Sequence, residues 1–414
     1  MAITGTPSEP GLAQPRAAVP VAAAASVTVM AGILAVSFNL RIGIVTVGPL
    51  IDDIRHATGM SSGVAGLLGA VPFLCMGIFA LVGPWLAARV GSAPLIGYAL
   101  ATLALGTVAR AVAPTAALVV VATVPIGIGI ALTSLALPGV IKENFPGRSG
   151  AATGSYVAAL ALGGGLAAVL VVPLADALGG WREAFVLTSL PAFLALPVWM
   201  HARGEVREDT GRMAALADAT DKWRPGSRGV RLGLMFGLQS MCFASVISWV
   251  AALYRHEGWG ADHAALTTAA VSFLVAPAGL VLPRLSEGRD RRIWVFWTAV
   301  VMSSAVLGLA IVPGTLPWLW VIAFGLGTGS IFSLMLTLPL DLGGSQAEVD
   351  ELTGWMLGLG YILAAAAPAL VGVGRDVTGS FGIPLIVMAV LGFGAGFVAL
   401  SPALERSSPG GGGR

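Results

Sequence analysis

Apolar stretches of roughly 20 residues recur along the whole chain, separated by short polar segments. A helix that crosses the hydrocarbon core of a bilayer needs about 20 consecutive apolar residues. The pattern therefore predicts twelve transmembrane helices. We place them, to within a few residues, at 21–50, 63–83, 93–112, 116–140, 150–177, 184–201, 230–253, 264–283, 293–312, 317–340, 352–374 and 382–401.

The composition agrees with an all-α membrane protein. Of the 414 residues, 56% are hydrophobic and only 11% are charged, and the mean hydropathy is +0.88. A soluble protein of this length would need more polar residues to cover its surface. Glycine and proline, of which the chain has 56 and 25, are tolerated better in membrane helices than in soluble ones.

The longest polar interruption divides the twelve predicted helices into six and six. We expect a disordered N-terminal tail at 1–19, a first six-helix half at 20–201, a cytoplasmic linker at 202–229, a second half at 230–401 and a disordered C-terminal tail at 402–414. The first 19 residues contain no short apolar core followed by a cleavage site, so we expect no cleaved signal peptide.

The basic residues indicate how the helices are oriented. If the N-terminus is cytoplasmic, 17 of the 23 lysines and arginines fall in cytoplasmic segments. Cytoplasmic loops of membrane proteins carry this excess of positive charge. We therefore expect both termini in the cytoplasm and a multi-pass protein of the inner membrane.

The two predicted halves repeat at a spacing near 200 residues. Four pairs of short motifs recur in the same order: 126–129 with 326–329, Leu137-Pro138 with Leu338-Pro339, Thr153-Gly154 with Thr353-Gly354, and 174–181 with 374–381. Two parallel halves with a substrate site between them are a known plan of secondary transporters.

Few ionisable residues fall inside the predicted helices, and none forms a catalytic set. The four histidines lie in loops or at helix ends, as do Asp176 and Asp341, and the two cysteines, Cys75 and Cys242, lie in apolar runs without metal-ligand spacing. A membrane-embedded enzyme would need clustered acids, bases or ligands. We therefore expect no enzymatic activity, no cofactor and no metal site.

Arg41 is the exception, because it lies within the first apolar run. It could extend to the outer interface or tie two helices together. Alternatively it could face a central cavity and bind an anionic or strongly polar substrate, which a permanently charged, planar guanidinium suits. We see no acid at the same depth that would neutralise it, which favours a substrate anion as its partner.

Asn39 and Arg41 are two residues apart, so they cannot share one face of a continuous helix. One could line the cavity while the other bonds a neighbouring helix. Two hundred residues on, the second half has Gln239 at the Asn39 position and Met241 at the Arg41 position. The expected site is therefore asymmetric, with its charge in the first half only.

Aromatic side chains could complete the site. For each of them, a position facing the cavity competes with ordinary packing or with anchoring at the membrane interface. The candidates are Tyr156, Phe243, Trp249, Trp355 and Tyr361.

Over residues 20–401 the chain resembles the major facilitator superfamily, and within it the branch of cyanate and 2-nitroimidazole transporters. The motifs that carry the resemblance are Asn39-Leu40-Arg41, Val47-Gly48-Pro49-Leu50, Thr58-Gly59-Met60-Ser61, residues 137–142 with 145–148, Gly237-Leu238-Gln239-Ser240 and Gly358-Leu359-Gly360-Tyr361.

The resemblance implies alternating access, with Asn39, Arg41 and Gln239 as polar contacts of the substrate. It also implies a gating loop after the second helix, here residues 86–91, with Arg89 and Gly91. The superfamily pattern has an acid directly before this arginine, where the chain has Ala88. The usual account of charge relay at this loop is therefore in doubt for this chain.

Our first hypothesis is a carrier of a small polar or anionic, cyanate-like solute held by Arg41. The second is an exporter of small heteroaromatic compounds such as nitroimidazoles, held by stacking and by Asn39 and Gln239. A third, a membrane sensor or enzyme, lacks a fused soluble domain and buried catalytic groups. The expected partners are a small-molecule substrate and the lipid bilayer, without nucleic acid, and we expect a monomer.

Overall fold

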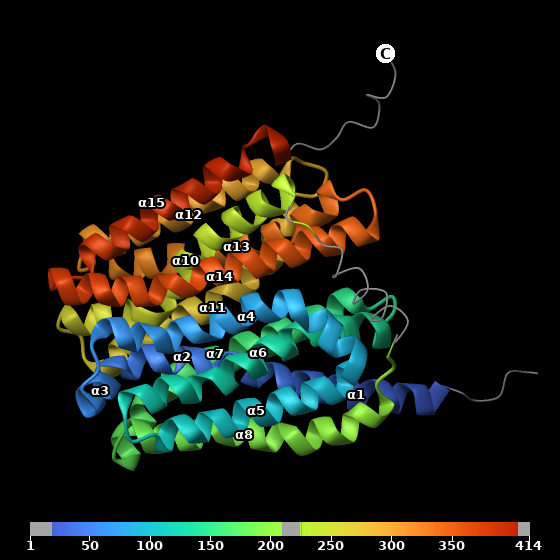
Figure 1. Ribbon diagram of the computed structural model, residues 1–414, viewed down its shortest axis with the longest axis horizontal. Coiled ribbons are helices and arrows are strands. Elements are labelled where there is room, and N and C mark those ends of the chain that lie inside the picture. Colours follow the sequence, from blue (N-terminus) through green and yellow to red (C-terminus); the bar gives the residue numbers. More distant parts are fainter. Residues whose placement is uncertain (1–18, 209–223, 225, 405–414) are drawn as a thin grey trace, which may run out of the picture.

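The computed structural model describes residues 19–208, 224 and 226–404, and this part of the chain is helical without β-strands (Figure 1). The first group of helices is α1 (Val19–Asn39), α2 (Ile42–Val45), α3 (Val47–Thr58), α4 (Ser62–Val90), α5 (Ser92–Val112), α6 (Ala116–Asn144), α7 (Ser149–Leu178) and α8 (Trp181–Ala202), followed by the short η1 (Arg203–Glu205). The second group is α10 (Ser227–His256), α11 (Ala261–Leu285), α12 (Arg291–Ile311), α13 (Pro317–Leu342), α14 (Gln346–Thr378) and α15 (Gly382–Ala399), followed by η2 (Pro402–Leu404).

Twelve spans in the described residues are long and apolar enough to cross a membrane, which confirms the number of transmembrane helices predicted from the hydropathy pattern. Most of the two expected tails and the centre of the expected linker lie outside the described residues. Within the described part, α1 already begins at Val19, and η2 occupies the start of the expected C-terminal tail.

The helices form two six-span bundles that lie against each other (Figure 1). The bundles meet mainly where α4 runs along α14 and where α7 runs along α11. The start of α1, the end of α8, the start of α10 and the end of α15 all lie on the right in Figure 1. We call this side the linker end and the opposite side the far end.

Corresponding helices of the two bundles end in the same way. α7 ends at Gly179 and α14 at Gly379, both in the left-handed region, and their N–H groups donate to the carbonyls of Ala175 and Arg375. Glycine adopts this conformation without the steric cost that a Cβ atom would add. The repeat of 174–181 in 374–381 therefore reflects equivalent helix ends, 200 residues apart.

The first span is not the single helix expected at 21–50. α1 ends at Asn39, Arg41 precedes the single turn of α2, and Thr46 separates α2 from α3. Pro49 explains the second break, because it has no N–H to donate to the carbonyl of Val45 and its ring crowds that carbonyl. The hydropathy pattern does not reveal such a break, because apolar residues continue through it.

Candidate substrate site between the two halves

Arg41 lies at the break in the first span, where the chain turns from α1 into α2. Its carbonyl accepts hydrogen bonds from the N–H groups of Ile44 and Val45, at 3.1 and 3.0 Å, so the residue itself starts the short helix. Its side chain runs past Gly164 of α7, where an added Cβ atom would lie 3.0 Å from the Cβ of Arg41. The glycine thus leaves room for the stem of the arginine.

The guanidinium of Arg41 faces the second half of the protein. Its Cζ atom lies 5.4 Å from the centre of the Phe243 ring on α10, within the range of a cation–π contact. The hydroxyl groups of Tyr156 and Tyr361 are within electrostatic range. Its buried Nη1 atom has no hydrogen-bond partner among the described residues. The site thus presents a cation whose hydrogen-bonding capacity is not filled by the protein described.

Four aromatic rings from both halves meet beside this cation. Phe73 of α4 contacts Phe243, with ring centres 6.3 Å apart, and Tyr361 of α14, at 6.1 Å. Phe236 of α10 meets Tyr361 edge-on at 5.0 Å. Phe73 and Phe236 were not among the predicted site residues, because a phenylalanine in an apolar run gives no sequence signal that separates lining from packing.

The predicted candidates divide into two sets. The structure brings Arg41, Tyr156, Phe243 and Tyr361 together; the first three are partly exposed, and Tyr361 is 9% exposed. Asn39 instead donates to the carbonyl of Pro191 at 3.3 Å and is 1% exposed, so its amide ties α1 to α8.

The remaining candidates lie in the packing of the second half. Trp249 donates its indole N–H to the carbonyl of Pro368 at 2.8 Å and is 1% exposed. Gln239 is equally buried and donates to the hydroxyl of Ser240, whereas its Oε1 atom has no partner within the described chain. Trp355 packs near Gly229, close to the linker end of α10 and α14.

A second buried arginine was not predicted. Arg110 on α5 is fully buried and donates from Nη1 to the carbonyl of Gly43 in α2, at 3.0 Å. Its Cζ atom lies 4.4 Å from the centre of the Phe185 ring. In the sequence, Arg110 falls in the last turn of the predicted helix 93–112 and therefore resembles an interfacial residue.

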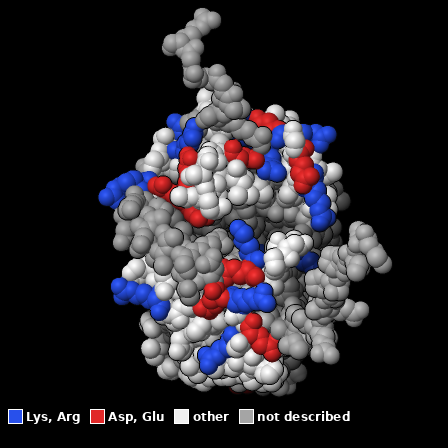
Figure 2. All heavy atoms as spheres, turned by 90° about the vertical axis from the view of Figure 1, so that its right-hand side faces the viewer, with Lys and Arg blue, Asp and Glu red and all other residues white. Residues whose placement is uncertain are grey.

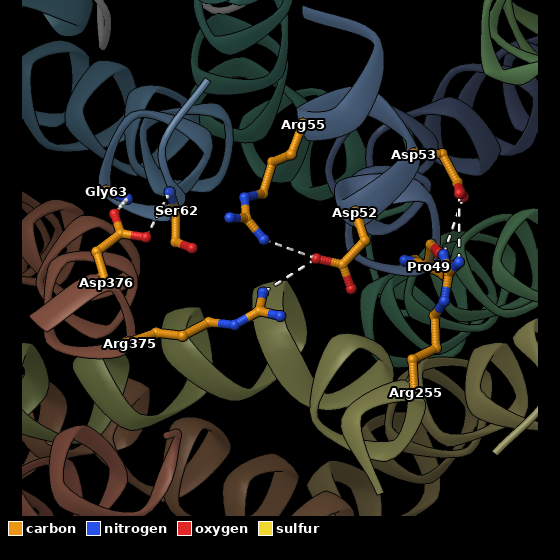
Figure 3. Close-up of polar contacts among 9 residues, drawn as sticks. All are labelled: Pro49, Asp52, Asp53, Arg55, Ser62, Gly63, Arg255, Arg375 and Asp376. Atoms are coloured by element: carbon orange, nitrogen blue, oxygen red, sulfur yellow. Dashed lines mark hydrogen bonds and ion pairs between the residues drawn. The ribbon is translucent and has the colours of Figure 1, made fainter. Parts of the chain in front are cut away.

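The far end of the interface is closed by ion pairs between the halves (Figure 3). Asp52 of α3 accepts from Arg375 of α14 at 3.0 Å and from Arg55 at 2.9 Å. Beside it, Asp53 pairs with Arg255 of α10 at 2.9 Å.

Asp376 adds a polar contact of a different kind at the far end (Figure 3). Its carboxylate accepts from the N–H groups of Ser62 and Gly63, at 3.0 and 2.8 Å, where α4 begins. The first N–H groups of a helix have no intrahelical partner and carry partial positive charge. A carboxylate from the second half therefore caps a helix of the first.

The linker end is open by comparison. Cβ atoms added at Gly139 of α6, and at Gly150 and Gly154 of α7, would meet no atom of another described residue within 4 Å. Figure 2 shows this face of the molecule, which carries charged side chains of both signs and is hollowed near its centre. The linker face is thus hollowed, whereas the opposite end is bridged by the ion pairs of Asp52 and Asp53.

The predicted gating residues lie at the linker end. Arg89 stacks on Trp85, with its Cζ atom 4.1 Å from the ring centre, and Gly91 has a positive φ of 89° between α4 and α5. A pocket of about 230 Å³ is lined by residues 87–92 and by Glu208.

Glu208 lies at the start of the connection to the second half, and its carboxylate accepts from the N–H of Ala93 at the beginning of α5. The predicted gating loop, which has Ala88 before Arg89, thus lies beside a carboxylate from a distant part of the sequence.

Comparison with known proteins places this architecture in context. The model of the Major Facilitator Superfamily matches residues 29–368. The cyanate transport protein CynX of Escherichia coli is 32% identical over 84% of this chain and 89% of its own length. The 2-nitroimidazole transporter of the same organism is 29% identical over 88% and 92%.

Among solved structures, an inward-facing, occupied bacterial homologue of the lysosomal transporter Spinster has a TM-score of 0.71 at 17% identity. The match covers 90% of this chain and 96% of that one. At this level of identity the likeness establishes the fold alone.

Proposed function

The chain belongs to the major facilitator superfamily, in the branch of cyanate and 2-nitroimidazole transporters, and we propose that it is a secondary carrier of small organic anions. The observation that carries the proposal is the Arg41 guanidinium, which has a buried Nη1 without a hydrogen-bond partner among the described residues and lies between the halves. Burying such a group without a partner is costly, and an anion would supply both charge and acceptors.

We propose that the substrate is bound by Arg41 and by the rings of Phe73, Phe243 and Tyr361. The arginine would hold an anionic head group, and the rings would contact a planar or apolar remainder. Asn39 is left out of this set because its amide already bonds α8. The substrate would leave chemically unchanged, since a carrier and not an enzyme is proposed.

We further propose that the linker end faces the cytoplasm and that the structure is the inward-facing state of an alternating-access cycle. Most of the described arginines and lysines lie toward the linker end, as the positive-inside rule requires of a cytoplasmic face. The ion pairs of Asp52 and Asp53 close the far end, whereas the glycines of α6 and α7 at the linker end meet open space. For transport, these ion pairs must break and the linker end must close.

Thermal unfolding of the purified protein in detergent tests the proposal. Ligands that bind only the folded state raise its stability, by about 2.7 kcal/mol at a concentration 100 times Kd. We expect cyanate or benzoate to raise the unfolding temperature of the wild type. Arg41→Gln should weaken anion binding by about 10- to 100-fold, since a hydrogen bond to a charged group contributes about 1.5–3 kcal/mol.

Arg182→Gln is the matched control, because Arg182 donates to the carbonyls of Ala111 and Ala113 at the far end, away from Arg41. It should bind anions as the wild type does. Stabilisation by anions that survives in Arg41→Gln would contradict the proposal.

The aromatic cluster favours a second candidate, an exporter of small heteroaromatic compounds. The contacts of Phe73 with Phe243 and Tyr361 could hold a neutral azole ring without the arginine. In the same experiment, stabilisation by 2-nitroimidazole that is equal in wild type and Arg41→Gln would support this candidate and make Arg41 a structural residue.

A further inference from the structure

Arg110 of α5 is a cation in an unusual place. Its side chain is fully buried, its Nε and Nη2 atoms have no hydrogen-bond partner among the described residues, and no ion pair is found for it in that part of the chain. Arginines are almost never fully buried unless they are paired. Burying an unpaired guanidinium costs free energy, and an apolar side chain of similar size would fill the same space at lower cost. We therefore expect Arg110 to have a specific role.

The one hydrogen bond that the Arg110 side chain makes to the described residues leads to the candidate substrate site. Its Nη1 atom donates to the carbonyl of Gly43, at 3.0 Å, and Gly43 lies two residues after Arg41 in the single turn of α2. A four-residue helix has little stability of its own, because nucleation fixes several residues for a single hydrogen bond. The turn that sets the direction of Arg41 therefore depends on contacts from outside.

The surroundings of Gly43 hold it from two sides. An added Cβ atom at Gly43 would lie 2.7 Å from Ile126 of α6, so this helix fits closely against the glycine. Gly106, one turn before Arg110 on α5, fits against the same Ile126. The ring of Phe185 on α8 covers the guanidinium of Arg110 at 4.4 Å. The carbonyl of Gly43 and its donor are thus fixed within the first half.

We infer that Arg110 is a positioning residue for substrate binding: it fixes the α2 turn through the carbonyl of Gly43 and thereby aims Arg41 into the site. The inference rests on the proposed function, since Arg110 acts through Arg41 and does not touch the substrate. It assigns to the break in the first span a dedicated support from α5. It also accounts for a buried cation that forms no ion pair with a described residue.

The first test compares ligand binding to the full-length protein in detergent, with benzoate as the anionic probe and 2-nitroimidazole as the neutral one. Arg110→Gln should weaken benzoate binding by about tenfold, a coupling typical of residues that act together, and leave 2-nitroimidazole binding unchanged. Arg110→Lys, which keeps the charge and a donor, should recover part of the loss. In the Arg41→Gln background, Arg110→Gln should have no further effect on benzoate.

The control is again Arg182→Gln, which removes a guanidinium that bonds backbone carbonyls of the same half but not of α2. If Arg110 is purely structural, Arg110→Gln should weaken the binding of both probes equally, or should leave benzoate binding unchanged, as Arg182→Gln is expected to do. Either result would overturn the inference. Absence of benzoate binding in the wild type would count against the proposed function and would leave the decision on Arg110 to the second test.

The second test needs no ligand. Ile44 lies in the α2 turn and is partly exposed, so Ile44→Cys, in a chain with Cys75→Ala and Cys242→Ala, reports on the turn through its rate of alkylation in native membranes. Adding Arg110→Gln should change this rate several-fold, and adding Arg182→Gln should not. An unchanged rate in Arg110→Gln would show that α2 does not depend on Arg110 and would refute the inference.

Discussion

At the far end of the interface between the halves, α4 and α14 cross with their backbones in contact, whereas Gly154 of α7 at the linker end faces open space. An added Cβ atom at Gly66 would clash with the backbone of Pro368, and one at Gly372 would clash with Ser62. An atom added at Gly154 would meet nothing. Gly66 and Gly372 therefore lie in a tight contact between the halves, whereas Gly154 does not.

The contacts at the far end show how a transporter could close one end and still be able to open it. The far end is closed by two means: close helix packing that only glycine permits, and ion pairs that are directional but only partly buried. Packing of this kind gains dispersion energy over many atoms, whereas ion pairs near water contribute modestly and can be exchanged for hydration. Both can therefore be broken without unfolding either half.

The largest effect should come from filling the close contact at the far end. Gly66→Ala should destabilise the structure by about 1–3 kcal/mol, because the added methyl group meets backbone that cannot rotate away. Gly154→Ala should be neutral or should stabilise by up to about 1 kcal/mol, since alanine favours helices over glycine. Unfolding temperatures in detergent would compare the two. Equal effects would contradict the asymmetry of the ends.

Removing a charge at the far end should have the next largest effect. Asp52→Asn leaves Arg55 and Arg375 without their shared carboxylate. We expect the free energy of unfolding to fall by about 1–3 kcal/mol, a value between those for surface and for buried ion pairs. The far end should then open more often. In a chain without native cysteines, Ser62→Cys, which replaces a side chain that is 1% exposed, should react faster with an impermeant thiol reagent.

The control for Asp52→Asn is Glu348→Gln at the linker end. There the ion pair with Arg228 is longer, at 3.8 Å, and more exposed. This substitution should leave the reactivity at the far end unchanged. A far end that reacts equally slowly in the wild type and in Asp52→Asn would indicate that helix packing alone closes it.

At the linker end, Glu208→Gln should have a small effect. It removes a negative charge from the start of α5, where a carboxylate contributes about 0.3–1 kcal/mol. We expect a slightly lower unfolding temperature and a lower uptake rate, because the predicted gating loop loses the charge of the carboxylate that lines its pocket. Glu205→Gln, on the exposed η1, is the control. Equal unfolding temperatures and uptake rates of the two variants would show that Glu208 has no specific role at the predicted gating loop.

The smallest effect should follow from Asp176→Asn and Asp341→Asn. Asp176 is exposed at the end of α7, and Asp341 pairs with Arg291 at 2.9 Å at the end of α13, so neither lies at the Arg41 site. Transport should remain largely intact, measured as uptake into proteoliposomes with an imposed pH gradient. Loss of pH-driven accumulation in either variant would assign it a role in coupling.

The sequence could predict the number of spans and their division into halves, and it singled out Arg41 as a candidate, because each leaves a mark in composition or spacing. It could not predict the break at Arg41, since Leu40 and Ile42 are as apolar as the helices around them. Nor could it separate Phe73, which lies beside Arg41's partner Phe243, from other phenylalanines in apolar runs. Asn39 and Trp249 were predicted to line the site, but both donate hydrogen bonds to carbonyls of neighbouring helices. A sequence does not show such bonds.

The fit of Arg41 against Gly164 also has a consequence for the synthesis of the protein. These residues are separated by 123 positions, and chains grow at about 5–20 residues per second, so Gly164 is added roughly 6–25 s after Arg41. During this interval the first span carries an arginine that would cost about 2.5–3.5 kcal/mol at the centre of a membrane helix. This cost is therefore relieved only after α7, and later α10 with Phe243, have been added.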